Sequence, residues 1–339
     1  MGSNVYIATA GINKITVADR ASRLASSSKR GDYCTQLNNG RSYVLLGDDP
    51  TIDVDWFDRG VQLKCIYTGG SFAPNLAWWS KGEGDTGSFT AVGNDVYVID
   101  PDKITSLSVN AQELDGIFDI TPLINLQGFD CSNNLITSVK IAGMSSLVSL
   151  TAWSNELAEI DLTGCTSMAY LQVQDNHLTI LDLRPCTNIT TVDCTTNSIT
   201  SFNANGCSSL ATVQGYFNDI TSVDLSGCVS METLYLYNNQ ISAIDISDCS
   251  ALVYLNLSTN LLTSLDVSGL ENLLEVRLSF NSLDSVDVDS ILIALAASAT
   301  GNFGNGFFDV ARTSASDAAF TLLTSGPRWW TFVFDNLPH

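Results

Sequence analysis

The chain has 339 residues, of which 45% are hydrophobic, so it can build a large core and does not have the composition of a disordered polymer. Its formal charge of −21, from 36 acidic and 15 basic residues, disfavours binding to nucleic acid and to anionic membranes. The sequence has no apolar run long enough for a membrane-spanning helix, and its first residues predict no secretory signal peptide.

Residues 1–100 predict a β-rich N-terminal module, because they are rich in Gly, Asp and aromatic residues and contain short strand-like runs. Strands are predicted at Ser42–Leu46, Gln62–Tyr67 and Asp95–Ile99. A short helix is predicted at Val17–Ala25, ahead of Gly31-Asp32-Tyr33.

Part of this module, residues 16–56, resembles a module that recurs in phage fibre and other virion proteins. There a VAD-x-x-A-R helix precedes Gly-Asp, a strand, a Gly/Asp turn, a second strand and a Trp; Gly31, Asp32 and Trp56 match these positions. The chain departs from the pattern in the Arg-Ala-Ser stretch of the helix and in a longer turn at Gly47–Pro50. The resemblance implies attachment to a virus particle. The alternative interpretation is a small β cap for the repeats that follow.

Residues 104–288 repeat with a period of 21, and METLYLYNNQISAIDISDCSA, which starts at Met231, is one row. The pattern L-x-x-L-x-L-x-x-N-x-L resembles the leucine-rich-repeat family, and residues 104–125 are a degenerate first copy with Gln112 in the Asn position. The ninth place of the later rows is always Asn, at Asn134, Asn155, Asn176, Asn197, Asn218, Asn239, Asn260 and Asn281.

The apolar places of each row predict a coil with one inward side. Leu234 and Leu236 alternate as in a short strand, and Ile241, Ile244 and Ile246 fill the rest of the interior. One row cannot bury its apolar side alone, so stacked rows form a continuous core. The stacked Asn side chains form a ladder that supplies hydrogen bonds to the backbone groups of the turns. The predicted fold over 101–288 is an α/β solenoid, a leucine-rich-repeat horseshoe of about nine rungs, rich in strand and turn.

Cysteines also recur, at place nineteen of the row. Other rows have Met144, Leu270 or Ile291 there, so the position is apolar and the thiols are predicted to be reduced and buried. Disulfides between neighbouring coils remain open, because coils lie about 5 Å apart. The recurring cysteines are Cys165, Cys186, Cys207, Cys228 and Cys249, and Cys131 and Cys194 replace Leu at place six.

Aspartate dominates place fifteen, which faces outward between two inward apolar places. A column of like charges is unfavourable unless something compensates it. We predict that each Asp caps its own following turn. The alternative is a hard cation such as calcium on the acidic column, which consists of Asp161, Asp182, Asp224, Asp245, Asp266 and Asp287.

After residue 288 the period breaks, and residues 289–339 predict an α/β C-terminal cap. Helices are predicted at Asp289–Ser298 and Ser316–Thr324, and strands at Phe307–Val310 and Trp329–Phe334. This tail resembles the caps that follow 21-residue repeats in bacteroidete and marine-virus proteins. Trp329 and Trp330 are interpreted as capping bulk rather than as a ligand site.

The outward places on the strand side are three, five, seven and eight, and several carry aromatic residues. Tyr216 and Tyr237 share place seven on adjacent rungs, so their rings can stack, and Tyr235 and Tyr254 extend the patch over three rungs. Exposed Tyr and Trp suit interfaces. The predicted ligand- or partner-binding residues are Trp153, Tyr170, Tyr216, Phe217, Tyr235, Tyr237, Tyr254, Arg277 and Phe280.

Catalysis is not predicted. The chain has only two histidines, His177 and His339, and no phosphate-binding loop or H-E-x-x-H motif, so no catalytic residues, metal ligands or cofactors are assigned.

The sequence thus predicts a non-enzymatic binding protein. The first hypothesis is a phage virion fibre or decoration protein, attached to other virion proteins by its N-terminal module and presenting the repeats to a host surface glycan or protein. The alternatives are a bacterial cell-surface or secreted adhesin and an intracellular protein-interaction scaffold. Whether the protein is a homo-oligomer is left open, because no heptads are present.

Overall fold

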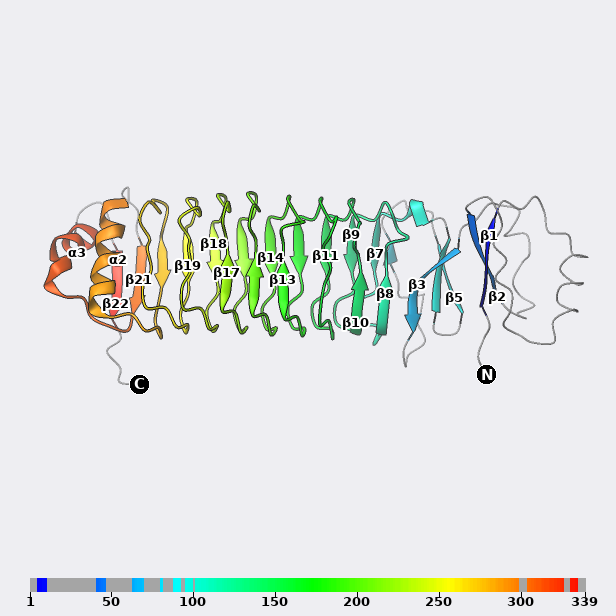
Figure 1. The fold of residues 1–339 in the computed structure, drawn as a ribbon, viewed down its shortest axis with the longest axis horizontal. Helices are drawn as coiled ribbons and strands as arrows, with labels where there is room; N and C mark the ends of the chain where they lie inside the picture. The colour runs from blue at the N-terminus through cyan, green and yellow to red at the C-terminus, as the bar shows by residue number, and fades with distance from the viewer. Residues whose placement is uncertain are drawn as a thin grey trace, which may run out of the picture.

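The computed structural model describes residues 5–10, 41–46, 63–69, 80–81, 88–92, 95–99, 101–298, 304–325 and 330–334. Figure 1 shows coils stacked side by side along the long axis of the molecule, with helices at the C-terminal end. The predicted solenoid is therefore confirmed. No helix within these ranges is long and apolar enough to cross a membrane.

One twelve-stranded sheet runs along the solenoid, and nine of its strands are parallel neighbours at the repeat interval. Their middle residues pair in register, as in Leu150↔Leu171 and Leu234↔Leu255, so each coil places its fourth residue on that of the next coil. The nine strands are β7 Ser106–Ser108, β9 Gly128–Asp130, β11 Ser149–Thr151, β12 Tyr170–Gln172, β14 Thr191–Asp193, β16 Thr212–Gln214, β18 Thr233–Tyr235, β19 Tyr254–Asn256 and β20 Glu275–Arg277.

The opposite side of the coils carries shorter runs of strand. β13 Ile180–Asp182, β15 Ser201–Asn203 and β17 Ser222–Asp224 form a parallel three-stranded sheet. The interior between the two sides is apolar: Leu234, Leu236 and Ile246 are buried, whereas Ile244 is only half-buried at its edge. Burying one Leu or Ile contributes about 1.5–3 kcal/mol, so the repeated interior is the main source of stability.

The Asn ladder is confirmed in every complete rung. Each Asn Oδ1 accepts the backbone N–H of a residue in the preceding coil, as Asn176 does from Leu157 at 2.9 Å. Its Nδ2 donates to carbonyl oxygens of its own coil and of the preceding coil, as Asn176 does to Val173 at 3.1 Å and Ala152 at 3.0 Å. The ladder thus joins adjacent coils where the strand ends and the chain turns.

The residue before each ladder Asn has a left-handed backbone conformation, which the sequence did not predict. The φ values lie between 53° and 60°, a region that is uncommon for residues other than glycine. The turn needs this conformation to direct the next Asn inward. The residues are Asn133, Ser154, Asp175, Thr196, Phe217, Asn238, Thr259 and Phe280.

The seven cysteines of the repeats are free thiols and buried. Cys165, Cys207 and Cys228 each lie 3.2–3.4 Å from a backbone carbonyl oxygen of the preceding coil, where the thiol can donate. Burial raises the pKa of Cys186 to about 12 and that of Cys207 to about 11. The prediction of reduced core thiols is therefore confirmed for these seven.

These thiols are expected to resist modification in the native protein. Because burial raises their pKa values, almost no thiolate forms near pH 8, and the nucleophile is the thiolate. A thiol-reactive dye should label the seven core cysteines only after denaturation. Fewer than seven free thiols in denaturant without reductant would contradict the reduced ladder.

The aspartates of place fifteen cap their own turns. Asp161, Asp182, Asp224, Asp245 and Asp266 each accept the backbone N–H of the residue two positions on, at 2.8–3.1 Å. Hydrogen bonds from that residue hold the pKa of each of these carboxyls below its usual range. Within the described ranges, no group of three His, Cys, Asp or Glu is arranged to hold a metal ion. The local capping interpretation accounts for the column.

The sixth member, Asp287, has a different role. Asp284 accepts the N–H groups of Val286 and Asp287 at 2.7 and 3.0 Å, and Asp287 accepts the N–H of Asp284 at 2.9 Å. This reciprocal pair is a capping box. Helix α2 therefore spans Ser285–Ser298, and the prediction that it starts at Asp289 was wrong by four residues.

The C-terminal elements close the end of the solenoid. β21 Gly304–Phe308 and β22 Trp330–Phe334 continue the twelve-stranded sheet, so the strand predicted at Phe307–Val310 lies nearer the N-terminus than expected. The 3-10 helix η4 Ser314–Ser316 leads into α3 Asp317–Thr324, close to the predicted bounds. Trp330 is buried, as expected for capping bulk, and Trp329 lies outside the described residues.

At the other end, the predicted strands at 62–67 and 95–99 join the solenoid. β3 Leu63–Gly69, β6 Asp95–Ile99 and β5 Ser88–Val92 continue a sheet with β8 Asp115–Asp119 and β10 Leu135–Lys140. β4 Ser80–Lys81 pairs with β7, and the 3-10 helix η3 Pro101–Lys103 leads into the repeats. β1 Val5–Ala10 pairs with β2 Arg41–Leu46, which matches the strand predicted at 42–46. The predicted helix at 17–25, Gly31, Asp32 and Trp56 lie outside the described residues.

Candidate functional site

The candidate site lies on the strand face, which we define as the outward side of β7 to β20 together with the two outward places after each strand. Because successive side chains of a strand alternate, places three and five point outward while place four is buried. Five rings gather on three consecutive rungs of this face. This aromatic cluster consists of Tyr216, Phe217, Tyr235, Tyr237 and Tyr254.

The centre of the cluster is a stacked pair. The rings of Tyr216 and Tyr237 lie 4.4 Å apart with an interplanar angle of 9°, as their shared place on adjacent rungs predicts. Phe217 meets both rings edge-on, at 5.5 Å from Tyr216 and 5.7 Å from Tyr237. Burial, and then the neighbouring Tyr216, raise the pKa of Tyr237 above its ordinary value. These three rings form one packed unit.

Tyr235 and Tyr254 extend the cluster toward the C-terminal end. Tyr235 is half-buried, and burial followed by the nearby Glu275 raises its pKa, with Tyr254 also contributing. Tyr254 is 41% exposed and pairs across the sheet with Glu275. An acidic side chain therefore borders the exposed ring on the neighbouring strand.

Arg277, a predicted site residue, has partners within the molecule. Its Nε lies 2.8 Å from Glu275 Oε1, and its guanidinium lies 4.5 Å from the centre of the Phe307 ring. Phe307 belongs to β21, outside the periodic repeats, so the repeat pattern carries no signal for this contact. The guanidinium is held between a carboxylate and an aromatic ring.

Phe217 and Phe280 occupy the left-handed place of their turns, and each is 53% exposed. A bulky residue in this conformation is unusual and costs of order 1–3 kcal/mol. Other rungs have Asn, Asp, Ser or Thr there. The two Phe residues therefore stand against the local backbone preference, and such strain is common at binding sites.

Trp153 and Tyr170 lie apart from the cluster. Trp153 follows β11, three rungs before Tyr216, which is about 14 Å along the stack. Tyr170 is in β12, two rungs before Tyr216, and is exposed beside Ser149 and Thr191 of the neighbouring strands. The structure does not bring these two residues into one patch with the others.

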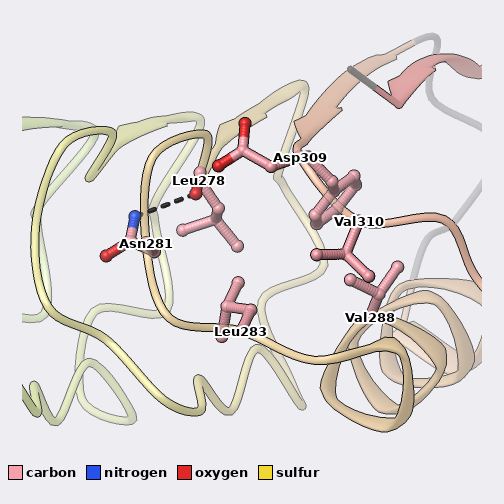
Figure 2. A pocket seen from close by; sticks show the side chains of 7 residues that line it. Leu278, Asn281, Leu283, Val288, Asp309 and Val310 are labelled. Atoms are coloured by element: carbon pink, nitrogen blue, oxygen red, sulfur yellow. Dashed lines mark hydrogen bonds between the residues drawn. The ribbon is translucent and has the colours of Figure 1, made fainter. Parts of the chain in front are cut away.

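A small pocket lies between the last repeat and β21 (Figure 2). Asn281, which lines it, donates to the carbonyl oxygen of Leu278 at 2.8 Å, so its amide is already used by the ladder. Most of the lining is apolar: Leu278, Leu283, Val288, Phe308 and Val310. The pocket is a packing seam between the repeats and the C-terminal elements.

Comparison with known proteins supports the repeat assignment. Residues 229–272 match the family model of leucine-rich repeats, as two copies. No curated protein matches the chain.

Solved structures with a similar fold come from several bacteria. The functional domain of InlJ from Listeria monocytogenes, described as including a cysteine ladder, is 23% identical over 63% of this chain and 51% of its own, with a TM-score of 0.46. A leucine-rich-repeat protein of Leptospira interrogans is 20% identical over 63% and 62%, with a TM-score of 0.44. YopM of Yersinia enterocolitica is 24% identical over 53% and 43%, with a TM-score of 0.41. The chain thus spans less than two thirds of each of these structures.

Proposed function

We propose that this leucine-rich-repeat solenoid is a non-enzymatic binding protein that contacts its partner through the aromatic cluster of its strand face. Solenoids of this kind offer extended faces suited to binding proteins. The observation that carries the proposal is the cluster itself, in which the rings of Tyr216, Phe217 and Tyr237 pack together and the exposed Tyr254 lies on the next rung of the same face. Contiguous exposed aromatic surface is uncommon on soluble monomers and marks interaction sites.

Replacing both Tyr235 and Tyr237 with alanine is expected to weaken partner binding at least tenfold, because buried aromatic anchors carry much of the energy of an interface. The measurement is binding of the labelled full chain to an array of host surface proteins and glycans. The matched control is Ile180→Ala, which truncates a side chain 60% exposed on the opposite sheet. Undiminished binding by a folded double variant would show that the cluster is not the binding site.

At a finer level, we propose that the protein is a virion fibre or decoration protein whose N-terminal module attaches it to the particle and whose strand face recognises a host surface molecule. The resemblance of residues 16–56 to phage fibre modules supports this. Immuno-electron microscopy of intact particles tests it, since label on the particle surface is expected. Label on bacterial cell surfaces instead would favour the adhesin, and label only inside cells would favour the scaffold.

A further inference from the structure

We infer that the aromatic cluster binds a basic segment of a protein, with an arginine or lysine side chain lying over Tyr254 between the coils that carry Glu232 and Glu275. This rests on the proposed function and names the chemistry of the partner. Three observations support it: the charge of the solenoid, the acidic side chains beside the cluster, and the way in which the face already holds an arginine of its own.

The repeats are strongly acidic. Between residues 104 and 284 there are 19 Asp and Glu residues but only three Lys and Arg residues, Lys140, Arg184 and Arg277. Arg184 lies 2.7 Å from Asp182, and Arg277 is paired with Glu275. The solenoid therefore attracts cationic partners and repels anionic ones.

Acidic residues occupy the coils on both sides of Tyr254. The backbone N–H of Tyr254 donates to the carbonyl oxygen of Glu232 in the preceding coil, so the two residues are backbone neighbours, and Glu232 is exposed. On the other side, Tyr254 pairs with Glu275 of β20. An aromatic face with carboxylates around it is the arrangement that attracts a guanidinium or ammonium group.

The same face shows this recognition within the molecule. The Arg277 guanidinium lies over the Phe307 ring at 4.5 Å while it pairs with Glu275 at 2.8 Å. The C-terminal end repeats the arrangement, where Arg312 lies 4.2 Å from the Phe320 ring and pairs with Asp317 at 2.5 Å. Tyr254 and Glu232 provide the ring and the carboxylate for a guanidinium from outside.

A glycan fits this cluster less well. A sugar stacks on an open ring face, but Tyr216 and Tyr237 cover one face of each other at 4.4 Å. A neutral sugar also gains little from the excess of carboxylates, whereas a cation gains directly. The observations therefore favour the basic peptide, and glycan binding becomes an outcome of the test.

The experiment uses the full chain and nine-residue Gly/Ser peptides that carry two arginines, two citrullines or two glutamates. Calorimetry should show the arginine peptide binding about tenfold more tightly than the citrulline peptide, which has the same shape without the charge. The advantage should disappear in Tyr254→Ala, shrink in Glu232→Gln and persist in Glu159→Gln. Glu159 is also an exposed carboxylate but lies five coils away from that of Tyr254, so it controls for the overall charge.

Three results would overturn the inference: equal affinity for the arginine and citrulline peptides, equal effects of Glu232→Gln and Glu159→Gln, or no binding of the arginine peptide at about 1 mM. Binding of neutral oligosaccharides that is lost in the Tyr235→Ala, Tyr237→Ala double variant would also overturn it, but would leave the proposed function standing. If peptides and glycans bind equally well to the wild-type chain and to the cluster variants, or do not bind at all, both the inference and the proposed function would be wrong.

Discussion

Replacing Asn239 with alanine is expected to lower the free energy of unfolding by about 3–5 kcal/mol, because it leaves the buried N–H of Ile220 without a partner and removes two further hydrogen bonds. Asn239 Oδ1 accepts the N–H of Ile220 at 2.9 Å. Its Nδ2 donates to the carbonyl oxygens of Gly215 and Leu236 at 3.0 Å. The two carbonyls keep hydrogen bonds from Asn218 and Asn260. The orphaned N–H costs about 1–3 kcal/mol and each other lost hydrogen bond about 0.5–1.5 kcal/mol.

The matched control for Asn239 is Asn272→Ala. Asn272 is exposed, and its amide makes one bond, to the carbonyl oxygen of Ser250 at 3.1 Å. Its replacement should cost less than about 1 kcal/mol. Chemical denaturation of both variants measures the difference, and hydrogen exchange should locate the loss in the coils of β16 and β18. Equal stabilities of the two variants would show that the ladder is not a main support of the fold.

The periodic part of the molecule was predictable because each place in the row has one environment. Asn, Cys and Leu recur where the coil needs an amide, a small apolar side chain or a large one, so the period alone fixed the register of nine strands. The stack of Tyr216 on Tyr237 followed directly from that register. Sequence could place these rings on neighbouring rungs because parallel strands align equivalent places.

Prediction failed where an element leaves the period. Asp287 occupies place fifteen like the turn-capping aspartates, but Asp284 lies three residues before it and completes a capping box that starts α2 early. Phe307 holds Arg277, although no repeat pattern reaches β21. The left-handed residue before each ladder Asn was also missed, because Thr196 and Phe217 do not resemble the Gly or Asn that usually mark such a turn.

One face of this regular solenoid differs from rung to rung, although the core is apolar in every rung. The core and the ladder constrain places one, four, six and nine, whereas the outward places of the strand face vary between rungs. In two rungs the left-handed place carries Phe instead of a small polar residue. The rigid ladder beside it compensates for the strained backbone, because its hydrogen bonds hold the turn from both coils. The stability of the repeats thus permits an aromatic cluster that an isolated turn would disfavour.

Trp330 is buried at the closing end of the solenoid, and Trp330→Ala is expected to cost about 3–5 kcal/mol. The indole is 3% exposed and stacks on Phe332 at 5.6 Å, and it occupies the space that a Cβ at Gly304 would need. Its Nε1 is buried without a hydrogen-bond partner in the described ranges, so Trp330→Phe should cost much less, because it removes that donor and keeps an aromatic ring. Denaturant unfolding and limited proteolysis of both variants measure this. Similar small losses in both would mean that the last coil is closed by other contacts and that the indole is free to serve another role.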